Sequence, residues 1–106
     1  MASGALKPLA RRIQWAFIYG SIARSAEHAA SDADLMIIGQ AGLAEVSSPL
    51  RKAERRLDRS VNPTTYTVDE FAARVKSNHH FVTAVMRSKK LFILGDSREF
   101  GRAFGN

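Results

Sequence analysis

The sequence contains no cysteine, no long apolar run and fewer acidic than basic residues. Without cysteine there can be no disulfide framework and no zinc–thiolate site, which suits a reducing cytoplasm. No apolar run approaches the ~20 residues of a membrane span. No signal peptide is visible, because residues 1–14 lack a continuous apolar segment. The chain is therefore expected to be a cytoplasmic protein that does not enter a membrane.

The shortage of acidic residues leaves a net charge of +6 over 106 residues. A net positive charge favours a polyanionic partner, such as a nucleoside triphosphate or a nucleic acid. The alternative is a basic surface that only keeps the domain dispersed. The sequence shows no aromatic stacking stripe and no recognisable DNA-reading helix, which counts against a dedicated nucleic-acid-binding protein.

The length predicts one small domain, residues 1–106, without internal repeats or linkers. Alternating apolar patterns indicate an α/β or α+β fold, in which helices cover a small mixed sheet of about four strands. The tail, 96–106, is expected to add one helical turn and then fray. Strands are expected over 15–19, 32–38, 60–66 and 91–94, and helices within 1–14, 48–59, 67–76 and 79–88.

Local signals predict where three of these elements begin or lie. Ser48 followed by Pro49 is typical of a helix start, so 39–47 is expected to be a connection with at most a turn of helix. Thr67 and Glu70 fit a capping box for the next helix. Pro63 cannot donate a backbone hydrogen bond, so its strand should lie at a sheet edge or contain a bulge.

The chain is organised around residues 15–39, which read as strand, Gly-Ser turn, polar loop and second strand. Ten residues separate Ser21 from Asp32, which opens the sequence Asp-Ala-Asp. Asp32 and Asp34 should share one face of the strand, where their charges would repel each other. A bound Mg²⁺ or Mn²⁺ would relieve this repulsion, since these ions prefer oxygen ligands. The alternative is that both are solvated loop residues or helix caps.

Gly20 and Ser21 form the turn before this loop. Glycine allows a ligand to approach the backbone, and a serine hydroxyl with free amides favours phosphate. A short helix is expected over 22–25, and Arg24 within it could contact a triphosphate. The alternative is an ordinary strand-to-helix turn with a surface arginine.

An apolar strand, Gly-Ser, about ten residues and Asp-x-Asp before a second apolar strand resemble the motif of the DNA polymerase β-like nucleotidyltransferase superfamily. The similarity is to its minimal nucleotidyltransferase domains. It implies that Gly20 and Ser21 hold the β and γ phosphates of a nucleoside triphosphate and that Arg24 contacts the triphosphate. It also implies that Asp32 and Asp34 are catalytic residues that hold two divalent ions, Mg²⁺ or Mn²⁺.

This chain departs from the family pattern at one important position. Active members commonly carry a third carboxylate on the next strand, facing the first two. Here that strand is expected over 60–66, and its inward residue is Asn62, which cannot act as a carboxylate base. Asp58, Asp69 and Glu70 are better explained as residues at helix ends. The resemblance therefore predicts the fold and nucleotide binding more firmly than it predicts turnover.

Two functions follow from the resemblance. The first is a Mg²⁺-dependent nucleotidyltransferase that moves a nucleoside monophosphate, AMP by family expectation, from a triphosphate to an acceptor hydroxyl. In some family systems the acceptor is a partner toxin of the HEPN ribonuclease class. The second is a degenerate fold that senses nucleotide or binds a partner, for which the basic helix 50–59 would be suited. In either case a second subunit or a partner chain is expected, because so small a domain leaves the cleft open.

Overall fold

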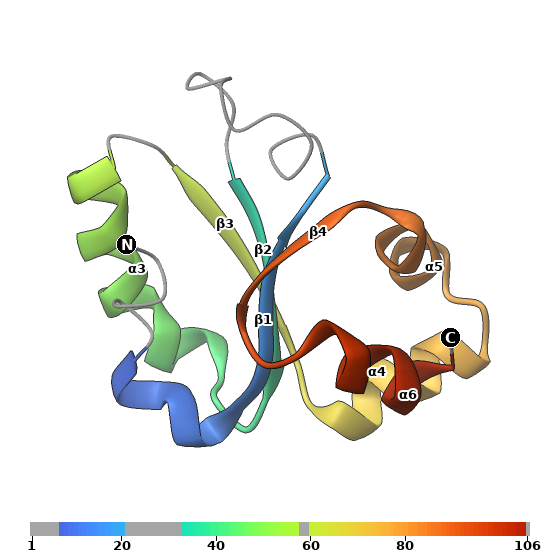
Figure 1. The fold of residues 1–106 in the computed structure, drawn as a ribbon. Helices are drawn as coiled ribbons and strands as arrows, with labels where there is room; N and C mark the ends of the chain where they lie inside the picture. The colour runs from blue at the N-terminus through green and yellow to red at the C-terminus, as the bar shows by residue number, and fades with distance from the viewer. Residues whose placement is uncertain (1–6, 21–32, 58–59, 106) are drawn as a thin grey trace.

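A four-stranded mixed sheet lies at the centre of the molecule, with helices on both faces (Figure 1). The computed structural model describes residues 7–20, 33–57 and 60–105. The strand order is β3-β2-β1-β4; β1 is antiparallel to β2 and β4, and β2 is parallel to β3. The predicted α+β fold with a small mixed sheet is confirmed. The strands are β1 (Ile13–Tyr19), β2 (Ala33–Gly39), β3 (Val61–Tyr66) and β4 (Lys90–Leu94).

Helix α3 covers one face of the sheet, and α4, α5 and α6 cover the other (Figure 1). A short 3₁₀ helix, η1, leads into β1 where the sequence predicted a helix within 1–14. None of the helices in the described parts of the chain is long and apolar enough to cross a membrane. The helices are η1 (Lys7–Arg12), α3 (Leu43–Leu57), α4 (Val68–Lys76), α5 (His80–Arg87) and α6 (Ser97–Phe104).

The alternation of side chains along β1 and β2 creates two apolar layers, one on each face of the sheet. The first layer joins the sheet to α4, α5 and α6 and is rich in aromatic residues, among them Trp15, Phe17, Phe71 and Phe100. The second joins the sheet to α3 and is aliphatic; it contains Ile13, Leu35, Ile37, Val46 and Leu50. Both faces of β2 are therefore covered, which explains the continuous apolar run of this strand.

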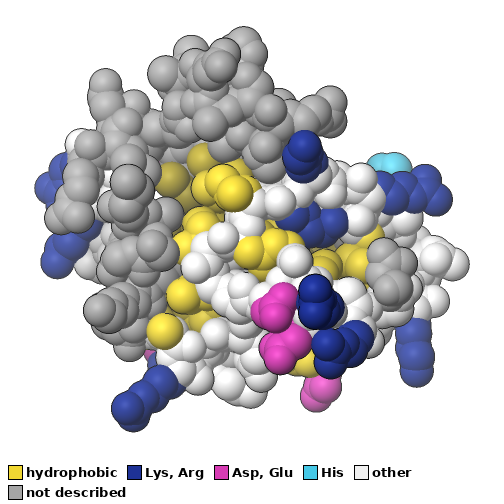
Figure 2. Space-filling model, viewed as in Figure 1, with side chains coloured by type: hydrophobic (Ala, Val, Ile, Leu, Met, Phe, Trp, Pro, Cys, Tyr) yellow, Lys and Arg dark blue, Asp and Glu magenta, His cyan; other side chains and the backbone are white. Residues whose placement is uncertain are grey.

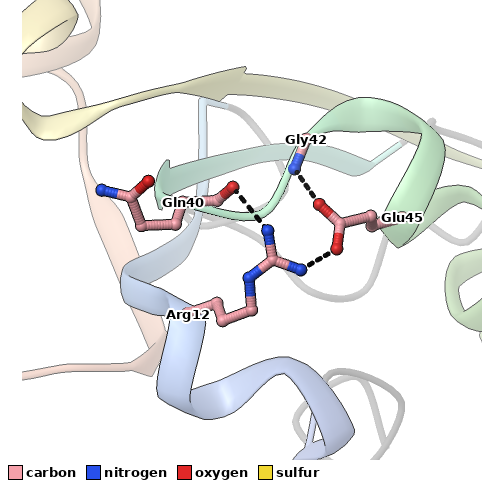
Figure 3. A network of polar contacts seen from close by, with 4 residues as sticks. All are labelled: Arg12, Gln40, Gly42 and Glu45. Atoms are coloured by element: carbon pink, nitrogen blue, oxygen red, sulfur yellow. Dashed lines mark hydrogen bonds and ion pairs between the residues drawn. The ribbon is translucent and has the colours of Figure 1, made fainter.

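Helix α3 begins at Leu43, five residues before the predicted start at Ser48. Figure 3 shows the reason: the Glu45 carboxylate accepts a hydrogen bond from the Gly42 backbone N–H at 3.0 Å and pairs with the Arg12 guanidinium. Arg12 also donates to the carbonyl of Gln40 at 3.2 Å. The start of α3 is therefore fixed by a contact with η1. Because η1 is distant in sequence, the residues near Ser48 do not indicate this start.

Pro49 consequently lies inside α3, contrary to its predicted position in the first turn. A proline within a helix lacks the N–H that would bond four residues back, which costs stability. Burial offsets this cost, because Val46, Leu50 and Ala53 recur at helical spacing and are almost fully buried. The helix forms here because tertiary packing outweighs the local preference for a helix start.

The last helix, α6, spans eight residues, so the expectation of one helical turn followed by fraying is wrong. The Asp96 carboxylate caps it by accepting from the Arg98 N–H at 2.8 Å. Phe100 and Phe104, one turn apart, are buried, and their rings lie 5.8 and 5.3 Å from the Trp15 ring. Edge-to-face contacts of this kind stabilise aromatic pairs. The tail of the sequence thus supplies part of the core.

The other two local signals are confirmed. Thr67 and Glu70 form the predicted capping box at the start of α4: the Glu70 N–H donates to the Thr67 hydroxyl, and the Thr67 N–H donates to the Glu70 carboxylate. Strand β3, which contains Pro63, lies at an edge of the sheet. A proline is tolerated there because no further strand needs its missing donor.

Gly95, at the end of β4, is expected to tolerate no side chain. Its φ is +85°, and a Cβ built there would meet the Gln14 carbonyl oxygen and lie 2.6 Å from Trp15 Cδ1. The clash would push β4 and α6 away from β1, so Gly95→Ala should lower the free energy of unfolding by about 3 kcal/mol. Chemical denaturation at neutral pH measures this change.

Gly105 provides the matched control, because it has the same φ of +85° and no atom within 4 Å of a built Cβ. Gly105→Ala should therefore cost only the left-handed backbone strain, about 1 kcal/mol. Equal losses for the two variants would show that steric contact at Gly95 does not matter.

Candidate functional site

The side chains of three neighbouring strands form rows across the sheet face that α4, α5 and α6 cover. At the end of the sheet where β1 stops and β2 and β3 start, Tyr19 pairs with Asp34, and Asp34 pairs with Asn62. The next row inward contains Phe17, Met36 and Thr64. Because side chains two positions apart share a face, all of these point the same way. Strand pairing thus gathers the polar residues in the outermost row.

Gly20 follows Tyr19 and makes the turn that leaves β1. Its φ of +82° lies in the left-handed region, which glycine adopts without strain. A Cβ built at Gly20 would lie 3.8 Å from Oδ2 of Asp34, so the carboxylate is turned toward this turn. The two predicted site residues that the structure describes, Gly20 and Asp34, therefore lie side by side.

The remaining predicted site residues, Ser21, Arg24 and Asp32, lie outside the described residues, as does the helix expected over 22–25. Asp32 comes two residues before Asp34 in the sequence. Within the described ranges, no cluster of three or more His, Asp or Glu side chains could hold a metal ion. A metal at this corner would therefore need Asp32 in addition to Asp34. The donors available there, carboxylate and amide oxygens, fit a hard cation such as Mg²⁺ or Mn²⁺.

Asn62 occupies the register position next to Asp34 on the parallel strand β3. It is exposed and shares the face of Asp34, which is where the resemblance places a third carboxylate in active nucleotidyltransferases. An amide oxygen can bind a cation but cannot accept a proton from an attacking hydroxyl at neutral pH. Asp69 and Glu70 lie in the first turn of α4, beyond the opposite end of β3. Neither of them can take the place of the missing acid.

Tyr19 is half-buried beside Asp34, and this position changes its acidity. Burial raises the pKa of the Tyr19 phenol above its ordinary value of 10.0, and the negative charge of Asp34 raises it further. A side-chain hydrogen bond with Thr64 opposes both effects. Tyr19 is therefore a neutral hydroxyl at physiological pH. Thr64 lies on this face because side chains alternate along β3 from Asn62.

The raised pKa of Tyr19 predicts a loss of stability in alkali. The folded state holds the phenolic proton more tightly than the unfolded state, so its contribution is complete below pH 10 and is lost as the pH rises through the folded pKa. We expect the wild type to lose stability relative to Tyr19→Phe, which has no phenolic proton, as the pH rises above 10. Urea denaturation of both proteins across this range measures the difference. Parallel curves would show that Tyr19 titrates normally.

On the face seen in Figure 2, Lys and Arg side chains form several separate groups among hydrophobic and uncharged side chains. On α3, Arg51, Lys52 and Arg55 are exposed, while Glu54 accepts a hydrogen bond from the Val61 N–H at 2.6 Å. On the face seen in Figure 2, the described residues thus form no single basic patch of the kind that binds nucleic acid.

Sequence comparison gives no identification, since no protein-family model and no curated protein matches this chain. Comparison with solved structures gives several matches. One is a mutant toxin–antitoxin complex, MntA–HpeT, with a TM-score of 0.59 and 11% identity over 94% of this chain and 75% of the other. A second is a toxin–antitoxin with AMP-PNP, with a TM-score of 0.57 and 13% identity over 97% of this chain and 81% of the other.

A third match is the complex of a tri-AMPylated HEPN toxin with the MNT antitoxin from Shewanella oneidensis. Its TM-score is 0.50, with 12% identity over 96% of this chain and 76% of the other. At identities this low, the similarity establishes the fold alone. That fold is the one found in the MntA nucleotidyltransferase antitoxins, as the Gly-Ser and Asp-x-Asp motif predicts.

Proposed function

We propose that this chain, which has the fold of nucleotidyltransferase antitoxins, is a single minimal domain that transfers AMP from ATP to a hydroxyl group of a partner protein. The proposal rests on one observation: the pairing of β1 with β2 places Asp34 beside the Gly20 turn, and both residues belong to the sequence motif. A protein that uses ATP is expected to work in the cytoplasm, the location that the cysteine-free sequence also favours.

In this proposal each motif residue has a defined task. The Gly20–Ser21 turn binds the β and γ phosphates, since its glycine leaves room for the phosphates beside the backbone. Arg24 neutralises part of their charge. Asp32 and Asp34 hold divalent cations, and bound Mg²⁺ would supply charge stabilisation for the α-phosphate. The acceptor oxygen forms a bond to the α-phosphorus, the bond to the bridging oxygen of pyrophosphate breaks, and the acceptor proton is released.

The similar structures support the choice of nucleotide and acceptor. One contains AMP-PNP, an ATP analogue, and in another the HEPN toxin beside the antitoxin is AMPylated. In the mutant complex, two aspartates with the spacing of Asp32 and Asp34 are changed to glutamate. These facts belong to other proteins, and they favour a HEPN-class protein as the partner here.

The test is transfer of label from α-labelled ATP to a HEPN-class partner protein from the same organism. With Mg²⁺ present, we expect the partner to gain label and the mass of one or more AMP groups, and we expect EDTA to abolish both. If the partner stays unlabelled while the chain binds ATP with Mg²⁺, the transfer proposal fails.

Asn62 favours a second candidate function. With a neutral amide beside Asp34, the chain could bind ATP and Mg²⁺ without transferring AMP, and so act as a nucleotide-sensing or partner-binding regulatory module. This candidate predicts heat of binding for ATP with Mg²⁺ in a calorimeter, together with no transfer. Absence of binding at millimolar nucleotide would exclude both functions.

A further inference from the structure

The two edge strands of the sheet differ in how well they are protected against pairing with another strand. Strand β3 contains Pro63, which cannot donate a backbone hydrogen bond. The Val61 N–H of the same strand already donates to the Glu54 carboxylate at 2.6 Å. Strand β4 has the sequence Lys-Leu-Phe-Ile-Leu, with no proline and no charge after its first residue. Charges and prolines are the usual protection of an edge strand, so β4 is open where β3 is not.

The outer edge of β4 still has backbone groups to offer. Within the described parts of the chain, β4 pairs with β1 and with no other strand. In an antiparallel sheet, alternate residues direct both their N–H and their C=O to the same neighbour. Some residues of β4 therefore direct both groups away from β1, where another strand could bind them.

A row of apolar side chains across the sheet becomes more exposed toward β4. On the face that α3 covers, Leu35 of β2 pairs with Ile18 of β1, and Ile18 pairs with Leu91 of β4. Leu35 is 1% exposed, Ile18 is partly buried, and Leu91 is 54% exposed. Ile93, two positions further along β4, also packs against this layer only in part. The apolar layer thus reaches the β4 edge, whereas α3 lies over β2 and β3 (Figure 1).

The charges at the two ends of β4 are opposite in sign. Lys89 and Lys90 stand at its start, and Asp96 follows its end. The Lys90 ammonium donates to the carbonyls of Met86 and Ser88, at 2.8 and 3.0 Å. Lys89 is exposed and forms no ion pair with any described residue. Two such strands placed antiparallel bring the basic start of each beside the acidic end of the other, whereas a parallel pair brings like charges together.

We propose that β4 is a homodimer interface, at which the β4 strand of a second copy of this chain pairs antiparallel with the first. A two-fold axis beside Phe92 sets Leu91 opposite Ile93 of the partner subunit, so that the exposed apolar side chains cover each other. The same register sets Lys89 next to Asp96 of the partner subunit. The two sheets become one continuous sheet. The proposal does not depend on the proposed function, since β1 and β4 separate Asp34 from the interface.

Sedimentation equilibrium of the full chain from micromolar to millimolar concentration tests the proposal. We expect the mass to rise to that of two chains. Leu91→Lys should raise the dissociation constant of the dimer about 100-fold, because the symmetric interface contains the new charge twice. Since Leu91 is exposed in the single chain, the variant should keep the circular dichroism spectrum of the wild type. A wild type that stays monomeric at millimolar concentration would overturn the proposal.

Leu43→Lys is the matched control. It makes the same change at a side chain that is 52% exposed, at the start of α3 instead of on β4, and should dimerise as the wild type does. Amide hydrogen exchange should also slow on β4 as the protein concentration rises. Equal weakening by Leu43→Lys and Leu91→Lys would contradict the assignment of the interface to β4. Slower exchange on β4 that requires a different protein would show that the edge serves that protein instead of a second copy.

Discussion

Changing Asp34 to asparagine is expected to reduce AMP transfer about 10³-fold, because a metal ion that stabilises developing charge contributes several kcal/mol to catalysis. Asp34 is the described carboxylate that faces the Gly20 turn, and Asn keeps its size while removing its charge. Fold stability should change little, since Asp34 lies at the end of the sheet and makes no ion pair with the described Lys and Arg residues. Initial rates of label transfer to the partner measure the effect.

Asp69→Asn makes the same chemical change at an exposed position in the first turn of α4, beyond the opposite end of β3. It should transfer AMP at the wild-type rate. Equal rates for Asp34→Asn and Asp69→Asn would remove Asp34 from the reaction. Equal losses in the two variants would point to a general loss of structure, which near-ultraviolet circular dichroism of Trp15 would reveal.

Asn62→Asp is expected to increase transfer about 10²-fold, the usual contribution of a well-placed general base. The new carboxylate would stand next to Asp34 in the strand register and on the same face. Without metal, the added negative charge should repel Asp34 and lower the melting temperature. Adding Mg²⁺ should restore the melting temperature. Transfer rates and thermal denaturation with and without Mg²⁺ measure both effects.

Asn78→Asp is the matched control for this charge change. Asn78 is exposed between α4 and α5 and has a φ of 57°, which aspartate tolerates. Its substitution should change neither transfer nor the response to Mg²⁺. If Asn62→Asp leaves transfer unchanged or reduces it, the general base lies elsewhere. Asn62 then does not explain a low activity of the wild type.

The sequence was sufficient to predict those parts of the fold that depend on local signals. The apolar runs of β1 and β2, the capping box of Thr67 and Glu70, and the edge position of Pro63 each have a cause within a few residues. The start of α3 depends on Arg12, which is 33 residues away from Glu45. Helix α6 depends on Trp15. Contacts so distant in sequence could not be read from local patterns.

The candidate site was predictable to a similar degree. Spacing alone put Gly20 and Asp34 in one motif, and strand alternation selected Asn62 as the residue facing them. The place of Tyr19 beside Asp34 could not be foreseen, because it depends on the antiparallel register of β1 and β2. The sequence predicts which residues form strands, but it does not predict the register in which the strands pair.

The most direct measurement is the broadening of backbone amide signals in nuclear magnetic resonance spectra when substoichiometric Mn²⁺ is added with a non-hydrolysable ATP analogue. A paramagnetic ion held at the proposed corner should broaden the signals of Gly20, Asp34 and Asn62 first and leave that of Asp69, beyond the far end of the sheet, unchanged. Broadening centred on any other part of the chain, or spread evenly over it, would contradict the assignment of this corner as the nucleotide and metal site.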